Sequence, residues 1–292
     1  MRDFGYFAPK NLGEAMSLLQ RYGAEARVLA GGTDLFLNLE RKLFVPKFIV
    51  DLKKIEGLKR IDASVDGLRI GALALMDEIA CHPLIQDRWR ILADAAAVVG
   101  SAQTRNRATL GGNLCNASPA ADTATPLLAL GARVRIVGGR GAREVLLEEF
   151  FIGPRKNCLE PDEILEELTV PLPPPNNGSS FQRRTRTAMD IALVNCAVFL
   201  TLSGAGDSID AVRIALGAVA PIPIRALDAE GILRGEEPTI GRIVEAASRA
   251  ALSARPIDDV RSSGAYRRDM VRVLTRWAIE EALQRAASKA QT

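Results

Sequence analysis

The stretch TLGGNLCNASPAAD (residues 109–122) holds more turn-forming and polar residues than a single tight turn requires. Two adjacent glycines are followed by an Asn, a Cys, a Ser-Pro pair and, at the end, one carboxylate, Asp122. One or two such residues suffice for a turn. The stretch is therefore either a connection between two core elements or a backbone surface shaped for a ligand.

A second glycine pair lies in ARVLAGGTDL (residues 26–35), where a short apolar strand runs directly into Gly31 and Gly32. Two residues without Cβ atoms leave backbone N–H groups free to point one way, and such groups bind phosphate oxygens. The flanking Thr and Asn side chains add donors. Each loop alone is explained as a tight turn with one glycine at positive φ. The two together make a two-sided pyrophosphate site an equal alternative.

The common nucleotide-binding motifs do not fit this chain. GGRGARE (residues 138–144) has Glu144 where a GxGxxG motif requires its third glycine, and no GxxxxGK[ST] motif is present. A dinucleotide bound here would therefore be held by a fold other than the Rossmann fold.

The composition is that of an ordinary globular chain of about two domains. Among 292 residues, 38 Lys and Arg against 35 Asp and Glu give a net charge of +3, which does not favour nucleic-acid or membrane binding. No signal peptide or apolar run of membrane-spanning length is found, so we expect a cytoplasmic protein. Four cysteines more than 30 residues apart and one histidine argue against a metal site and favour buried, unreactive thiols.

Hydrophobic periodicity and turn residues predict a mixed α/β layout. Residues 12–22 are expected to form a helix that ends at Gly23, and short strands in residues 26–30 and 47–52 to pack side by side. The Asp-Gly pair at residues 66–67 predicts a β-hairpin. Further along the chain, we expect a helix in residues 88–101, a helix running into a strand in residues 127–139, a linker at residues 171–180, strands in residues 190–204 and 211–220, and helices in residues 239–253 and 265–288.

Asp122 has two interpretations. It is a candidate N-cap for the following helix, with Thr125 before Pro126 as the rival cap. Its carboxylate is equally a candidate acceptor for a hydroxyl or ring N–H group of a ligand.

Four segments together carry a family resemblance: VLAGGTDL (residues 28–35), RNRATLGGNLCNASPAAD (residues 105–122), MDIALVNCAV (residues 189–198) and RIALGAVAPIPIRA (residues 213–226). With these segments in this order, the chain resembles the FAD-binding medium subunit of the molybdenum hydroxylases, the xanthine dehydrogenase and carbon monoxide dehydrogenase family. The resemblance covers nearly the whole chain, and its two glycine motifs are specific jointly.

The resemblance implies an α+β fold of the vanillyl-alcohol-oxidase (PCMH) type. Two α/β subdomains, residues 1–57 and 58–176, would bind FAD with its pyrophosphate between the two glycine loops. Residues 177–292 would form a C-terminal CO-dehydrogenase-flavoprotein-like domain with an antiparallel sheet and helices.

The family's FAD contacts carry over onto positions of this chain as follows. The first loop contributes Val28, Leu29, Ala30, Gly31, Gly32, Thr33, Asp34 and Leu35, and the second contributes Ala108, Thr109, Gly111, Gly112 and Asn113. Cys115 is expected near the flavin, Asp122 on the ribityl or adenosine part, Leu165 along the adenine or flavin, and Arg183 as a source of positive charge.

Two positions depart from the family pattern. Relatives place a Phe where this chain has Val99, and a Lys where it has Gln182. Arg183 or Arg184 is expected to supply the missing charge. The cysteine spacing excludes the extra iron–sulfur loop of the 4-hydroxybenzoyl-CoA reductase branch.

The resemblance implies an oxidoreductase subunit in which the cofactor supplies the chemistry. FAD would receive electrons from the [2Fe–2S] clusters of a small subunit, which takes them from a large molybdenum-cofactor subunit, and pass them to an external acceptor. The complex would be a dimer of heterotrimers, and no residue of this chain is assigned as catalytic. The alternatives are a stand-alone flavin oxidase of the same superfamily and a non-catalytic nucleotide-binding module.

Overall fold

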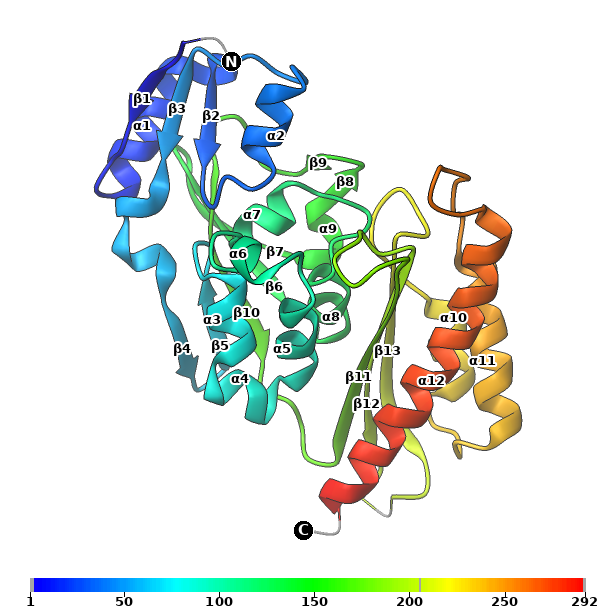
Figure 1. Cartoon of the computed structure of the whole chain (residues 1–292). Coiled ribbons are helices and arrows are strands. Elements are labelled where there is room, and N and C mark those ends of the chain that lie inside the picture. Colours follow the sequence, from blue (N-terminus) through cyan, green and yellow to red (C-terminus); the bar gives the residue numbers. More distant parts are fainter. Residues whose placement is uncertain (1–2, 205, 291–292) are drawn as a thin grey trace.

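The computed structural model describes residues 3–204 and 206–290. Its N-terminal part is a parallel three-stranded sheet of order β1-β3-β2, formed by β1 (Gly5–Phe7), β2 (Ala26–Leu29) and β3 (Phe48–Asp51). The predicted pairing of the second and third of these strands is confirmed. Two helices, α1 (Leu12–Tyr22) and α2 (Leu35–Glu40), accompany the sheet (Figure 1).

Helix α1 forms over the predicted residues and ends at the predicted Gly23, and the structure adds an N-terminal cap. The side chain of Asn11 accepts a hydrogen bond from the backbone N–H of Glu14, and the helix ends at Gly23, which has a φ of +47°. Its last residue, Tyr22, stacks on Phe48 of β3 with ring centroids 3.9 Å apart. This contact fixes the helix against the small sheet.

The middle part is built on a five-stranded antiparallel sheet of order β4-β5-β10-β6-β7. The predicted hairpin is confirmed, although its turn lies one residue earlier, at Val65 and Asp66, and Gly67, with a φ of +139°, is the first residue of β5. The strands are β4 (Ile61–Ser64), β5 (Gly67–Gly71), β6 (Arg133–Gly138), β7 (Gly141–Leu146) and β10 (Ile164–Pro171), and a separate pair is β8 (Phe151–Gly153) with β9 (Lys156–Asn157).

Short helices pack against this sheet and build the largest hydrophobic core. They are α3 (Met76–Cys81), α4 (Pro83–Arg88), α5 (Arg90–Ala97), α6 (Ala102–Arg105), α7 (Leu110–Cys115), α8 (Ala124–Ala129) and α9 (Leu147–Phe150). Trp89 is buried in this core, and its Nε1–H donates to the carbonyl oxygen of Pro171 at 2.9 Å. Three short 3-10 helices, Gly23–Glu25, Leu52–Lys54 and Glu56–Lys59, lie in the connections.

The C-terminal part is a four-stranded antiparallel sheet of order β11-β12-β13-β14. Helices α10 and α11 and the long helix α12 cover one side of it, and α5 and α8 of the middle part contact the same strands (Figure 1). The elements are β11 (Asn177–Arg184), β12 (Val194–Leu202), β13 (Ile209–Gly217), β14 (Ile224–Arg225), α10 (Leu227–Leu233), α11 (Ile240–Ser253) and α12 (Gly264–Ala290).

The predicted linker at residues 171–180 is wrong in its second half. Residues 177–180 already belong to β11 and pair with β12. Their sequence, NGSS, has no apolar period because backbone pairing and a close approach to α12 define the strand there: a Cβ atom at Gly178 would lie 1.8 Å from the carbonyl oxygen of Ala282. Among the elements that were not predicted are helices α2, α7 and α10 and strands β1 and β14.

The prediction of buried, unreactive thiols holds in full only for Cys196, because Cys115 is partly exposed at the cleft. Burial raises the pKa of the Cys115 and Cys196 thiols to about 12. Cys81 is exposed and Cys158 is partly buried. The reason is position: Cys81 ends the surface helix α3, whereas Cys196 lies on the central strand β12.

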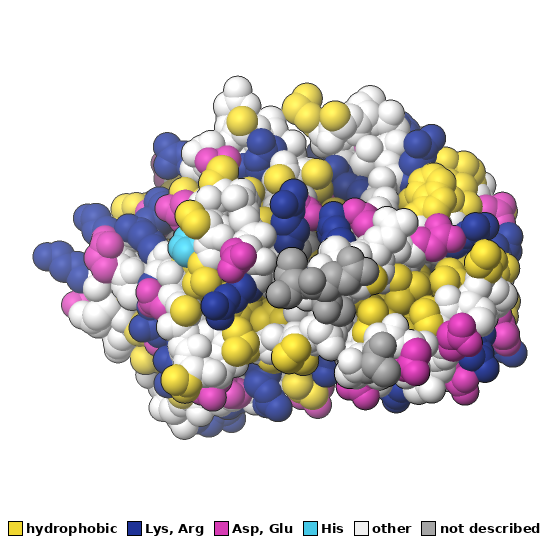
Figure 2. Space-filling model, turned by 90° about the horizontal axis from the view of Figure 1, so that it is seen from below, with side chains coloured by type: hydrophobic (Ala, Val, Ile, Leu, Met, Phe, Trp, Pro, Cys, Tyr) yellow, Lys and Arg dark blue, Asp and Glu magenta, His cyan; other side chains and the backbone are white. Residues whose placement is uncertain are grey.

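The described surface shows neither a membrane span nor a metal cluster. Within residues 3–204 and 206–290, no helix has the length and apolar character needed to cross a bilayer, and no three His, Cys, Asp or Glu side chains gather as a metal site. Basic and acidic side chains are interspersed on the face near the C-terminus (Figure 2). That face has no extended single-sign patch of the kind that binds nucleic acid.

Substitution of Gly178 tests the packing of β11 on α12. We expect Gly178→Ala to lower the free energy of unfolding by about 3 kcal/mol, because the new methyl group overlaps the helix backbone. Chemical denaturation measures the loss. Gly241→Ala is the matched control, since a Cβ atom there meets nothing within 4 Å, and it should leave stability unchanged or raise it. Equal stability of both variants would contradict the packing.

Candidate functional site

One open cleft, with a volume of about 1720 Å³, receives residues from all three parts of the chain. It is lined by every predicted site residue except Leu29. These lining residues are Val28, Ala30, Gly31, Gly32, Thr33, Asp34, Leu35, Ala108, Thr109, Gly111, Gly112, Asn113, Cys115, Asp122, Leu165 and Arg183. Leu29 instead packs into the core beside Leu39 and Ile49, because side chains alternate along a strand and its neighbours Val28 and Ala30 face the cleft.

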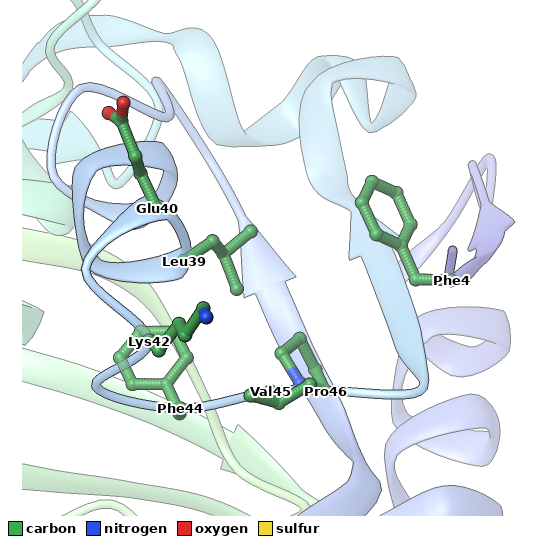
Figure 3. Close-up of a pocket in the computed structure, with 7 residues that line it drawn as sticks. All are labelled: Phe4, Leu39, Glu40, Lys42, Phe44, Val45 and Pro46. Atoms are coloured by element: carbon green, nitrogen blue, oxygen red, sulfur yellow. The ribbon is translucent and has the colours of Figure 1, made fainter. Parts of the chain in front are cut away.

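A smaller pocket of about 360 Å³ lies beside α2 and the segment that follows it (Figure 3). Its lining is largely apolar, with one acidic and one basic side chain: Phe4, Leu39, Glu40, Lys42, Phe44, Val45 and Pro46. None of the predicted site residues lines this pocket. The cleft is therefore the candidate site.

The first glycine loop presents a row of unpaired backbone donors. The five N–H groups of residues 31–35 donate to no acceptor in the part of the chain that the structure describes. Gly32 has a φ of +83°, and a Cβ atom there would lie 2.8 Å from the ring of Phe36, so both backbone and packing require glycine. Unpaired N–H groups in a loop that leads into a helix bind anionic oxygens.

Gly31 is required for a different reason, because it brings the two loops into contact. A Cβ atom at this position would lie 2.0 Å from the carbonyl oxygen of Arg107, directly before the second motif. The absence of a side chain thus lets the backbone of the first loop rest on the backbone of the second.

The prediction of free backbone N–H groups is wrong for the second loop. Leu110 and Gly111 donate to the carbonyl oxygens of Ala74 and Ala72, at 3.0 and 2.8 Å. Gly112 donates to the side chain of Thr109, which caps α7, at 3.1 Å. The physical reason is that Gly111 packs against Ala72, where a Cβ atom would lie 2.6 Å away, so this loop's N–H groups fasten it to the middle part of the chain.

Asn113 is the second loop's side-chain donor. Its Oδ1 accepts a hydrogen bond from the Thr123 hydroxyl at 2.7 Å. This contact uses the oxygen end of the amide, and Nδ2 donates to no residue that the structure describes. The amide therefore offers its N–H groups to a ligand in the cleft.

Both capping interpretations at the following helix are wrong. Helix α8 starts after Thr123 and has no side-chain cap. Asp122 instead forms an ion pair with Arg183, with Oδ1 3.1 Å from Nε, and accepts a hydrogen bond from Nδ2 of Asn195 at 3.2 Å. The Thr125 hydroxyl also bonds to Asn195, at 3.0 Å. Tertiary partners from the C-terminal sheet have replaced the local cap.

Burial raises the pKa of Asp122 to about 6, although Arg183 and Asn195 both favour the ionised carboxylate. In the first loop, burial also raises the pKa of Asp34, and the charge of Arg155 partly offsets this rise. Ionisable groups with raised pKa values thus stand on both sides of the cleft, as is common at functional sites.

Of the two candidate cations, Arg183 and Arg184, only Arg183 lines the cleft. Its guanidinium donates to the carbonyl oxygens of Val98 and Asp190 as well as pairing with Asp122. The neighbours of Arg183 point elsewhere, since side chains alternate along β11. Gln182 donates to Glu281 at 2.7 Å, and Arg184 donates to the hydroxyl of Tyr266 at 3.3 Å.

Sequence reasoning missed several polar residues that line the cleft, Arg107, Asn116, Ser118, Arg155 and Asn157. Arg155 has a φ of +59°, and its backbone N–H donates to the carbonyl oxygen of Ala117, itself at positive φ. The Gly-Pro before Arg155 was the available signal for this turn. Arg155 reaches the cleft through its contact with Ala117, which belongs to a segment distant in sequence.

Two family models match consecutive parts of the chain. The FAD binding domain in molybdopterin dehydrogenase matches residues 2–173. The CO dehydrogenase flavoprotein C-terminal domain matches residues 179–282. The chain belongs to the FAD-binding medium subunits of the molybdenum hydroxylases. The family resemblance seen in the sequence is confirmed, as is FAD as the cofactor.

Relatives match over almost their full length. The carbon monoxide dehydrogenase medium chain of Hydrogenophaga pseudoflava is 31% identical, over 97% of this chain and 98% of the relative. The xanthine dehydrogenase FAD-binding subunit of Escherichia coli O157:H7 is 34% identical over 100% of both chains. These FAD-binding medium subunits of oxidoreductases confirm that this chain is an oxidoreductase subunit.

Solved structures of the same family share the fold. A chain of H. pseudoflava carbon monoxide dehydrogenase, from a form lacking the Mo-pyranopterin moiety, superposes with a TM-score of 0.95 at 32% identity, covering 97% of this chain and 98% of that one. A chain of quinoline 2-oxidoreductase from Pseudomonas putida 86 gives 0.92 at 31% identity, covering 98% of both. The predicted fold class is confirmed.

The raised pKa of Asp122 predicts a pH-dependent stability. Its folded pKa of about 6 lies above the unfolded value, so the folded state binds more protons between these two values, and this group's contribution to stability rises as the pH falls. We expect the wild type to gain about 1 kcal/mol relative to Asp122→Asn between about pH 7 and pH 5. Urea unfolding of both proteins at the two pH values measures the difference, and parallel pH profiles would contradict it.

Proposed function

We propose that this FAD subunit holds the cofactor across the cleft and links partner iron–sulfur clusters to an external electron acceptor. FAD, when bound, supplies the electron-transfer chemistry, and the chain supplies binding, orientation and the surrounding electrostatics. No residue of the chain is assigned as a general acid, base or nucleophile. The single observation that carries the proposal is the row of five unpaired N–H groups in residues 31–35, which faces the same cleft as the second loop.

The two loops would hold the FAD diphosphate in different ways. The first loop offers backbone N–H groups, which Gly31 and Gly32 leave unpaired by letting the loop rest on Arg107 and take a positive φ. The second loop offers the Nδ2 of Asn113, while its own backbone is committed to the fold. The diphosphate would therefore be held by backbone N–H groups of the first loop on one side and by the side chain of Asn113 on the other.

The remaining predicted contacts follow from position along the cleft. Leu165 and Val99 supply apolar lining, and Cys115, whose thiol is held protonated by burial, supplies a small uncharged side chain near the flavin. Asp122 supplies an acceptor for a ribityl or adenosine hydroxyl. Arg183 adds positive charge within the cleft wall, although its guanidinium already contacts Asp122 and two carbonyl oxygens.

The proposed partners are a large molybdenum-cofactor subunit and a small subunit with two [2Fe–2S] clusters, assembled as a dimer of heterotrimers. Support comes from relatives that are themselves medium or FAD-binding subunits. Relatives named for carbon monoxide, xanthine and quinoline chemistry are about equally similar, at 31, 34 and 31% identity. This similarity supports recognition of the organic substrate by another subunit. A cytoplasmic location and the domain limits at residues 57 and 176 remain predictions.

Asn113→Asp tests the side-chain donor. The carboxylate retains an acceptor for the Thr123 hydroxyl but replaces the free amide by negative charge facing the diphosphate, so we expect FAD affinity to fall about 100-fold or more. The melting temperature of the apo chain should change little. FAD binding is measured by quenching of flavin fluorescence.

Asn176→Asp is the control for Asn113→Asp. It makes the same chemical change at a residue outside the cleft with a φ of +54°, a conformation that Asp also tolerates. It should bind FAD like the wild type. If both variants retained wild-type affinity, Asn113 would not face the diphosphate.

Purification distinguishes the proposed complex from the alternatives. A tagged chain expressed with its native partners should retain flavin absorbance and co-purify with chains that carry iron–sulfur clusters and molybdenum. A flavin-bound chain that oxidises an organic substrate by itself would support the stand-alone oxidase. A chain without flavin bands after addition of FAD would contradict the proposal.

A further inference from the structure

Asn195 is a buried polar residue of the C-terminal sheet whose side chain reaches into the FAD-binding part of the chain. It lies on β12 with no exposed surface, where an unpaired amide would cost stability. Both of its side-chain hydrogen bonds go to the segment around α8. The Thr125 hydroxyl donates to Oδ1, and Nδ2 donates to Oδ1 of Asp122. Because a hydroxyl donor occupies the oxygen end, Thr125 determines that the N–H end faces Asp122.

The neighbouring strands complete this arrangement. Asn195 lies opposite Arg183 on β11 and opposite Gly217 on β13. A Cβ atom at Gly217 would lie 2.2 Å from Oδ1 of Asn195, so glycine leaves the space that the amide occupies. Arg183 brings its Nε to 3.1 Å from the same oxygen of Asp122 that Asn195 contacts. Arg183 and Asn195, on two neighbouring strands, thus contact one carboxylate oxygen, and Gly217 on a third strand leaves room for the amide (the packing of α8 on this sheet is visible in Figure 1).

The second oxygen of Asp122 has no such partner. Asp122 lines the cleft, and its Oδ2 accepts no hydrogen bond from any residue in the described part of the chain. A carboxylate accepts through both oxygens, so Oδ2, at the wall of the cleft, is able to accept a hydrogen bond from a further donor. With Oδ1 fixed by a cation and an amide, the rotation of the carboxylate is fixed as well.

We propose that Asn195 is a positioning residue for FAD: with Arg183 it fixes Asp122 so that Oδ2 accepts a hydrogen bond from a hydroxyl or N–H group of the cofactor. The inference rests on the proposed FAD-binding function. Asn195 does not touch the cofactor and acts through Asp122. Residues of the C-terminal sheet thereby control the affinity for FAD. The positive charge of Arg183 stabilises the Asp122 carboxylate rather than the flavin ring.

Asn195→Leu in the full-length chain tests the proposal. Leucine has a similar volume but no donor, so Asp122 loses one of the two groups that fix it, and FAD binding should weaken about tenfold. The decisive measurement is a double-mutant cycle with Asp122→Ala. If Asn195 acts through Asp122, Asn195→Leu should cause no further loss of FAD affinity in the Asp122→Ala background.

Two further variants keep the test independent of folding. Thr125→Val removes only the hydroxyl that orients the amide, and we expect about threefold weaker FAD binding even if Asn195→Leu does not fold. Thr275→Val is the matched control: its hydroxyl is equally buried but lies in the C-terminal part beside Cys196, so its loss should lower the melting temperature but leave FAD affinity unchanged.

The outcomes separate the inference from the function on which it rests. A wild-type chain that fails to bind added FAD would overturn the proposed function. A wild-type chain that binds FAD, with wild-type affinity in Thr125→Val and in folded Asn195→Leu, would overturn the inference alone. Loss of affinity that is additive with Asp122→Ala would also overturn it, because the effect would then not pass through Asp122.

Discussion

The close backbone contact between Gly31 and Arg107 is the constraint on which the cleft depends. It joins the N-terminal parallel sheet to the middle part of the chain at the start of the second glycine motif. Any side chain at residue 31 would separate the two loops. Because they meet there, the free N–H groups of residues 31–35 and the side chain of Asn113 line one space. The glycine therefore serves first to assemble the site and only through that to bind a ligand.

The two glycine motifs resemble each other in sequence but differ in physical use. In the first, positive φ at Gly32 and a following helix leave donors unpaired. In the second, Gly111 allows α7 to pack on the backbone of residue 72, and the N–H groups of residues 110–112 donate to Ala74, Ala72 and the Thr109 side chain. Backbone polar groups are paired within a fold wherever an acceptor is near. The unpaired N–H groups of the first motif are thus the ones that indicate a ligand site.

A second interaction on which the structure depends lies between the middle part and the C-terminal sheet, where Asp122 contacts Arg183 and Asn195. Burial of Asp122 is unfavourable for its charge, and the C-terminal sheet supplies the compensating cation and amide. The network therefore couples the docking of the middle part and the C-terminal sheet to the state of one carboxylate in the cleft wall.

The sequence by itself determined the elements whose causes are local. Helix α1 with its end at Gly23, the hairpin near the Asp-Gly pair and the first glycine motif follow from capping, turn chemistry and glycine's freedom at φ, and the family followed from the order of the motifs. Only the tertiary structure decided that residues 177–180 form a strand, that Asp122 pairs with Arg183 and Asn195 instead of capping α8, and that Leu29 turns away from the cleft. The physical reason is that each of these depends on an atom contributed from a distant segment, such as the helix backbone at Ala282 or the amide of Asn195. A local pattern states what a residue is able to do, and the partner that the fold brings to it determines which of those interactions forms.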